Sequence, residues 1–234
     1  MKLINNLLLG ATGASKTVPA EHIKNTMRWT KDIGMFTIDR SREESCVHKT
    51  QFCDDTCFNN KLERAFGHAI HPKDVRNDQA WSNIMENDHT DIFKGKRRQT
   101  QRARLMSRGE AFKDFSDIKR VQRLANQTPD TLWWIPSRAW RDATLWADVE
   151  RLEKITPNLR ILASVDPSNT AEEWEHLAER SIMFFGDDDM TTAPTGERMF
   201  LCPKTHKHMD GHCAICKGGC FRADKKVVVH LKQH

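Results

Sequence analysis

Cysteine side chains are the residues of this sequence best suited to chemistry, and they fall into two groups. The first group is C-x6-C-x3-C, formed by Cys46, Cys53 and Cys57. The second is C-x10-C-x2-C-x3-C, formed by Cys202, Cys213, Cys216 and Cys220. Together they account for all seven cysteines. Soft thiolate sulfur suits zinc and iron–sulfur clusters, and an odd number of clustered cysteines favours metal ligation over disulfides in a reducing compartment.

The two groups predict different kinds of site. Three cysteines that hold a [4Fe-4S] cluster leave one iron open to a substrate or cofactor. The four C-terminal cysteines suffice for a closed site, which is either an auxiliary cluster or a zinc ion. Two alternatives stay open: thiols that bind no metal, and a C-terminal cysteine that completes the first site.

Histidines near the first group offer a further ligand. One lies inside the group and three follow it: His48, His68, His71 and His89. Such histidines are usually surface or capping residues, and the sharper interpretation is that one of them is the fourth ligand of a cluster.

Apolar periodicity predicts the elements that position these residues. Residues 34–38 form a strand before the first cysteine group, a helix begins at residue 59, and 67–101 is irregular helix and loop. Further strands are expected at 103–106, 131–135, 159–165, 182–185 and 227–229, and residues 199–201 lead into the second cysteine group. Helices are expected at 115–125, with Phe115 on the apolar face, at 146–155, with Ile155 on that face, and at 170–178. Pro136 is expected to end its strand.

Strands that alternate with amphipathic helices predict an α/β fold with a parallel sheet. We expect a partial (β/α) barrel of about six parallel strands over residues 1–201. Residues 202–234 would form a cysteine-rich metal-binding extension packed on the barrel. Gly109-Glu110, residues 137–138 and Ser164 to Asp166 all follow strand ends, so we expect them to converge with the first cysteine group at one mouth.

Composition indicates a soluble protein. The chain has 234 residues, a formal net charge of +5 and 38% hydrophobic residues. Nothing approaches transmembrane length, which predicts no membrane association and a cytoplasmic location. The basic run Lys94–Arg104 is expected to be a solvated loop, with weak nucleic-acid contact as the alternative, because no aromatic residues are interleaved with it.

The order of the predicted elements resembles that of the radical S-adenosylmethionine enzymes. It is a strand, a three-cysteine loop with Phe58 beside its last cysteine, a helix, and a strand ending in Gly109-Glu110. In that superfamily, three cysteines hold a [4Fe-4S] cluster whose fourth iron chelates the methionyl group. The family spacing is C-x3-C-x2-C, so the spacing here is a departure, and Arg108 stands where the family has glycine. The resemblance implies that Glu110 receives the ammonium of S-adenosylmethionine. The expected cofactor-binding residues are Gly109, Glu110, Ser164 and Asp166.

Most of the chain is similar to the phage gene product 88 family. The matching segments are Leu-Leu-Leu-Gly…Ser-Lys near the start, the first cysteines with Phe58, residues 157–158 and 164–166, Cys202-Pro203 with the second cysteine group, and a terminal Val-Val-Val-His230. This resemblance implies a bacteriophage origin, a location in the host cytoplasm and a cluster-bearing protein.

Two functions of different classes follow. The first is a bacteriophage iron–sulfur protein with a [4Fe-4S] cluster, extending to a radical-SAM-like enzyme of unknown substrate. The second is a non-catalytic module, stabilised by zinc or a cluster, that binds nucleic acid or a host protein through Lys94–Arg104.

Overall fold

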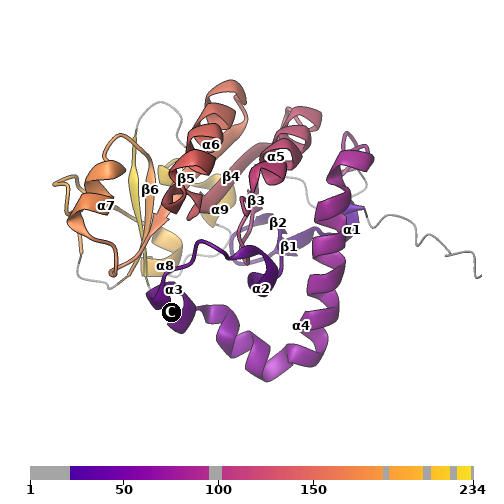
Figure 1. The fold of residues 1–234 in the computed structure, drawn as a ribbon, viewed down its shortest axis with the longest axis horizontal. Helices are drawn as coiled ribbons and strands as arrows, with labels where there is room; N and C mark the ends of the chain where they lie inside the picture. Colours follow the sequence, from indigo (N-terminus) through magenta and orange to yellow (C-terminus); the bar gives the residue numbers. More distant parts are fainter. Residues whose placement is uncertain (1–21, 95–101, 187–189, 208–211, 222–225, 233–234) are drawn as a thin grey trace, which may run out of the picture.

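The computed structural model describes residues 22–94, 102–186, 190–207, 212–221 and 226–232, which form one eight-stranded sheet with helices between its strands (Figure 1). The strands are β1 (Arg28–Thr30), β2 (Met35–Ile38), β3 (Arg102–Leu105), β4 (Leu132–Ser137), β5 (Leu159–Val165), β6 (Ile182–Gly186), β7 (Phe200–Leu201) and β8 (Val228–Lys232). Their order is β1-β2-β3-β4-β5-β6-β8-β7. Only β1 runs antiparallel to its neighbour; all other pairs are parallel.

Strands β2 to β6 lie side by side in sequence order because a helical connection returns the chain after each one. The four longer connecting helices are α4 (Phe58–Ser82), α5 (Phe115–Gln127), α6 (Ala143–Ile155) and α7 (Ala171–His176). The shorter helices are α1 (Ile23–Thr26), α2 (Arg42–Ser45), α3 (Gln51–Asp55), α8 (Pro203–Lys207) and α9 (His212–Ile215), and the 3-10 turns are η1 (Asn83–Glu86), η2 (Ala139–Arg141) and η3 (Gly219–Phe221). In such a sheet the carboxyl ends of the parallel strands share one edge.

Local sequence explains where these helices begin. The side chains of Asp114 and Asp142 accept backbone N–H groups in the first turns of α5 and α6. Thr170 and Glu173 form a capping box at the start of α7. Each cap satisfies amides that the helix leaves without partners, which fixes the first residue of each crossover.

The two faces of the sheet carry different layers. On one face, alternate strand residues such as Phe36, Trp133 and Ile161 pack in the larger core beneath the helices. On the other, Met35, Trp134 and Leu162 pack against residues of the second cysteine group. The period-two alternation of strand side chains thus assigns the helices to one face and the C-terminal cysteines to the other.

The α/β class and the mainly parallel sheet are confirmed, but the expected barrel is not shown. The sheet is open, with β1 and β7 at its edges. Pro136 does not end its strand: β4 continues to Ser137. The pairing of β4 with β3 stops at Trp134, so Pro136 pairs only with β5 and its missing N–H removes no hydrogen bond to β3. Strands β7 and β8 lie on either side of the expected domain boundary at residue 202 and pair within the same sheet. The boundary itself stays a prediction.

The polar stretch after the first cysteine group is mostly helix, contrary to the expected irregular structure. Helix α4 extends to Ser82 and is kinked at Phe66. Its buried face carries polar residues such as Asp74 and Asn77, so it has no apolar stripe for a periodicity argument to detect. Phe115 and Ile155, both expected on buried faces, are exposed because they lie at the ends of their helices.

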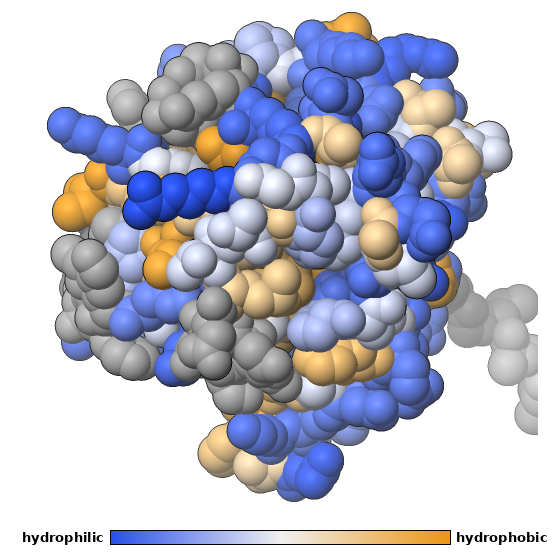
Figure 2. All heavy atoms as spheres, turned by 90° about the vertical axis from the view of Figure 1, so that its left-hand side faces the viewer, coloured by the Kyte–Doolittle hydropathy of each residue, from blue (hydrophilic) through white to orange (hydrophobic). Residues whose placement is uncertain are grey.

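Within the described ranges, no helix is both long enough and apolar enough to cross a membrane. The face that carries α7 is mainly hydrophilic, with small separate hydrophobic patches (Figure 2).

Candidate metal-binding sites

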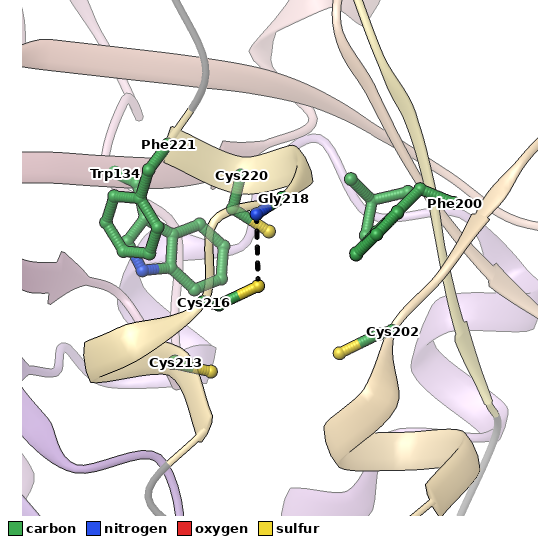
Figure 3. Close-up of a pocket in the computed structure, with 9 residues that line it drawn as sticks. Trp134, Phe200, Cys202, Cys213, Cys216, Gly218, Cys220 and Phe221 are labelled. Atoms are coloured by element: carbon green, nitrogen blue, oxygen red, sulfur yellow. Dashed lines mark hydrogen bonds between the residues drawn. The ribbon is translucent and has the colours of Figure 1, made fainter.

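The four C-terminal cysteines line one cavity on the face of the sheet opposite the helices (Figure 3). Cys202 follows strand β7 and is buried, and Cys220 lies in η3. Cys213 lies in α9, and Cys216 directly follows that helix. The rest of the cavity wall is Trp134, Phe200, Gly218, Phe221 and Val229. The sequence therefore brings four thiols together inside a mostly apolar wall.

Two arginines of β3 lie beside this cavity, on the side of the sheet. The Arg102 guanidinium donates to the carbonyl oxygens of Cys213 (3.0 Å) and Cys216 (2.5 Å) and lies 4.4 Å from the ring centroid of Phe221. The Arg104 guanidinium lies 4.7 Å from the ring centroid of Trp134. It has no carboxylate within ion-pair distance in the described part of the chain. The positive charges thus face the thiols.

The surroundings of the thiols favour their protonated form as long as no metal is bound. Burial, followed by the neighbouring Cys202, raises the pKa of Cys213 to about 11, although Arg104 acts in the opposite direction. Burial, Cys202 and Cys213 also raise the pKa of Cys220. The backbone N–H of Gly218 donates to Cys216 Sγ at 3.3 Å, which stabilises a thiolate. Metal binding here must therefore release protons.

The sulfur atoms surround the cavity rather than meeting at one point (Figure 3). As the side chains stand, no three His, Cys, Asp or Glu residues among those described are close enough to share one metal ion. The donor set itself, four thiols in an apolar wall with arginines beside them, suits a thiolate-bound metal centre.

The first cysteine group lies on the loop after β2, at the carboxyl edge of the sheet. Cys46 follows α2, Cys53 lies in α3 and Cys57 is the N-cap of α4. Burial, then Glu110 and Cys53, raises the pKa of Cys46 to about 12. Cys57 also acts on Cys46, so the three thiols form one electrostatic group.

A buried ion pair connects this loop to two later strands. Arg138 follows β4 and pairs with Asp166, which follows β5, at 2.8 Å. Asp166 also accepts the Thr50 hydroxyl at 2.6 Å, and Thr50 Oγ1 accepts the Cys53 N–H at 2.9 Å. Burial raises the pKa of Cys53, whereas the neighbouring Arg138 lowers it. The pair therefore positions the cysteine loop and supplies positive charge beside one thiol.

Replacing Asp166 with alanine tests this positioning role. The substitution leaves Arg138 buried without its carboxylate, so we expect the free energy of unfolding to fall by about 3–5 kcal/mol. Urea denaturation measures the change, and Asp130→Ala, at an exposed aspartate, serves as the matched control. Equal midpoints for Asp166→Ala and the control would contradict the role.

Glu110 is buried, and its carboxylate is engaged by the backbone. It accepts the N–H groups of Ala111 (2.8 Å), Phe112 (3.2 Å) and Arg138 (2.8 Å). Its own N–H donates to Ser45 Oγ at 2.9 Å. Gly109, with φ of 84°, is required here, because a side chain would lie 2.8 Å from Arg40 O and Ser45 Oγ. Residues 109–110 thus clamp the cysteine loop to the strand ends.

The structure brings most of the predicted strand-end residues together. Glu110, Arg138 and Asp166 are linked through the contacts above. Ser164 lies within β5, where its carbonyl accepts Trp140 Nε1 at 2.8 Å. Arg108, which the resemblance places beside Glu110, instead pairs with Asp74 of α4.

The histidines and the basic run divide differently. His48 Nε2 is buried and has no hydrogen-bond partner among the residues that the structure describes. His68 and His71 are exposed, and the ring of His89 hydrogen-bonds to the Ile84 carbonyl. Residues 95–101 of the basic run lie outside the described residues. Its last two arginines, at 102 and 104, face the second cysteine group.

Sequence reasoning missed the arginines beside the thiols. Arg102 and Arg104 alternate with Ala103 and Leu105 on β3, so the period-two pattern already places them on the face opposite the helices. Thr50 and Arg42 carry no such signal. Arg42 lies beside Cys57, and only the folded loop shows this.

A family model described as Gene product 88 matches residues 6–233, which is nearly the whole chain. The chain belongs to the Gene product 88 family. The resemblance to this phage family, which the cysteine motifs and the other matching segments predict, is thereby confirmed, whereas no match supports the resemblance to radical S-adenosylmethionine enzymes. No curated protein and no solved structure matches the chain.

Proposed function

We propose that this Gene product 88 protein is an iron–sulfur protein with two sites. One [4Fe-4S] cluster would be held by Cys202, Cys213, Cys216 and Cys220, and another by Cys46, Cys53 and Cys57. The observation that carries the proposal is the convergence of four thiols on one apolar cavity. Bound clusters supply one-electron chemistry, and the protein tunes it through burial and hydrogen bonds to sulfur.

The spread of the sulfur atoms supports a cluster over zinc at the C-terminal site. A [4Fe-4S] cluster binds each thiolate through a different iron, so its ligands are arranged around a body of some size. Zinc instead gathers four sulfur atoms at about 2.3 Å from a single centre. The thiols of this cavity stand apart around a gap (Figure 3), and among the described residues no three donors are close enough to share one ion, which supports a ligand with several irons.

Charge supports the same proposal. Four thiolates around a cluster leave a net negative charge, and burying it without a counter-charge is unfavourable. Arg102 and Arg104 supply positive charge at the C-terminal cavity, and Arg138 and Arg42 lie beside thiols of the first group. Each cysteine group thus has two guanidinium groups beside it.

The first group would leave one iron without a cysteine ligand. The proposal assigns no S-adenosylmethionine to that iron, since the Glu110 carboxylate is already engaged by three backbone amides. Cofactor binding by Gly109, Glu110, Ser164 and Asp166 stays a prediction. Open coordination makes this group the candidate site for chemistry, and the C-terminal group the candidate for electron transfer or structure.

Metal analysis of anaerobically purified protein tests the proposal directly. We expect iron and acid-labile sulfide in equal amounts, with the broad absorption of a [4Fe-4S] protein. Protein from iron-replete cells that contains only zinc would contradict the proposal and favour the non-catalytic module.

A further inference from the structure

A second pocket, which contains no cysteine, opens next to the first cysteine group. It lies between the kinked helix α4 and the carboxyl ends of β2 and β3, and its volume is about 240 Å³. Its wall begins at Phe58, directly after Cys57, and includes the kink residue Phe66. The pocket approaches the range typical of small-molecule sites, ~300–1,000 Å³.

The polar wall of this pocket is basic. Arg28, Lys73 and Arg108 line it, against one acidic residue, Asp39. Arg28 is half exposed and lies 3.6 Å from Asp39. The Lys73 ammonium has no hydrogen-bond or ion-pair partner in the described part of the chain. Burial, followed by Arg28, lowers the pKa of Lys73, so an anion between the two cations would relieve their repulsion.

A buried amide lies in the same wall. Asn59 is 2% exposed, and its Oδ1 accepts no hydrogen bond from any residue that the structure describes. An unsatisfied buried carbonyl is unfavourable by about 1–3 kcal/mol, so a hydrogen-bond donor on a bound ligand would stabilise this site. Hydroxyl and amino groups of a ligand are donors of the required kind.

The apolar wall is exposed and partly aromatic. Phe58 is 42% exposed and Phe66 is 55% exposed. On α4, Leu62 lies between these two rings and Ile70 follows them. Exposed aromatic rings beside cations are the combination that stacks bases and binds phosphates.

We propose that this pocket binds a phosphorylated nucleoside unit. Its phosphate would lie between Arg28 and Lys73, its base against Phe58 or Phe66, and a hydroxyl or amino donor at Asn59. The unit is a free nucleotide or one residue of a single strand, since both present the same chemistry. The site is independent of the cysteines and stands whether or not the cluster proposal holds.

Calorimetry on the full chain, with metal as purified, tests the proposal. The probes are adenosine monophosphate, adenosine, inorganic phosphate and a five-residue single-stranded oligodeoxyadenylate. We expect the monophosphate or the oligonucleotide to bind at least about tenfold more tightly than adenosine or phosphate alone. Whichever of the monophosphate and the oligonucleotide binds more tightly identifies the source of the nucleotide unit. Added salt should weaken binding of the oligonucleotide more than binding of the monophosphate.

Two variants locate the binding. Lys73→Gln should weaken phosphate-bearing probes about tenfold, and Phe66→Ala should weaken them by a similar factor through lost stacking. Lys61→Gln, at an exposed lysine of the same helix, is the matched control and should bind like the parent. Thermal melting confirms that each variant is folded.

The proposal is overturned if neither nucleotide probe binds at millimolar concentration. Equal binding of inorganic phosphate and nucleotide would overturn the nucleoside part. Unchanged affinity in folded Lys73→Gln would overturn the location. Positively charged S-adenosylmethionine should bind more weakly than the monophosphate, and the reverse order would overturn the anionic class.

Discussion

Protein with Cys216→Ala is expected to lose one of two cluster signals and to keep the other. The thiol of Cys216 faces a cavity that it shares with Cys202, Cys213 and Cys220. The thiols that act on the pKa of Cys220 are Cys202, Cys213 and Cys216, whereas the thiols that act on the pKa of Cys46 are Cys53 and Cys57. Each group therefore has its own electrostatic neighbourhood, and removal of one ligand should affect one site.

Cys53→Ala is the reciprocal variant, and each variant controls for the other. We expect it to lower iron and sulfide by about half and to remove the electron paramagnetic resonance signal that Cys216→Ala retains. Iron analysis and spectra of the reduced proteins measure both effects. If both variants lose the same single signal, the two groups share one site, and the partition of three plus four cysteines is wrong.

Much of the fold could be predicted because a parallel sheet buries both faces of its strands. Runs such as Met35–Ile38, in which every residue is buried, are visible in the sequence as apolar segments. The start of helix α4 was predicted, but its continuation beyond Phe66 was missed, because the buried residues there include Asp74, which pairs with Arg108, and Asn77 instead of an apolar stripe. The short edge strand β1 was also missed, because three residues carry little periodicity.

The cysteines of the candidate sites could be predicted from the sequence, whereas the contacts of the charged side chains beside them could not. Cysteine spacing marked both groups, and the rule that parallel strands end at one edge brought Glu110, Arg138 and Asp166 together. What the rule could not give is the direction of each side chain. Glu110, which was expected to bind a cofactor, turns toward backbone amides, and Arg108, which stands where the resembled family has glycine, turns toward Asp74. Such choices depend on partners distant in sequence.

The C-terminal metal should also hold that part of the sheet together, and its removal should destabilise the protein. Among the described residues between Cys202 and Cys220, few side chains are buried, and Ile215 is 74% exposed. Ligation of a structural metal contributes on the order of 10 kcal/mol in small zinc domains. Here Arg102 and the packing of Phe221 on Trp134 remain without metal, so the expected loss is smaller, about 5 kcal/mol.

The double variant Cys213→Ser, Cys216→Ser is therefore expected to melt about 10–20 °C below the parent, given about 2–4 °C per kcal/mol for a chain of this size. Serine keeps the side-chain size but replaces soft sulfur with oxygen, so the change isolates ligation. Ile215→Ser, between the two ligands, is the matched control and should melt within about 2 °C of the parent. The segment that carries the second cysteine group packs on β8. Backbone hydrogen exchange of Val229 and His230 should therefore become faster in the double variant and not in the control. Parent-like melting and exchange in the double variant would show that the cysteines of this cavity do not stabilise the fold.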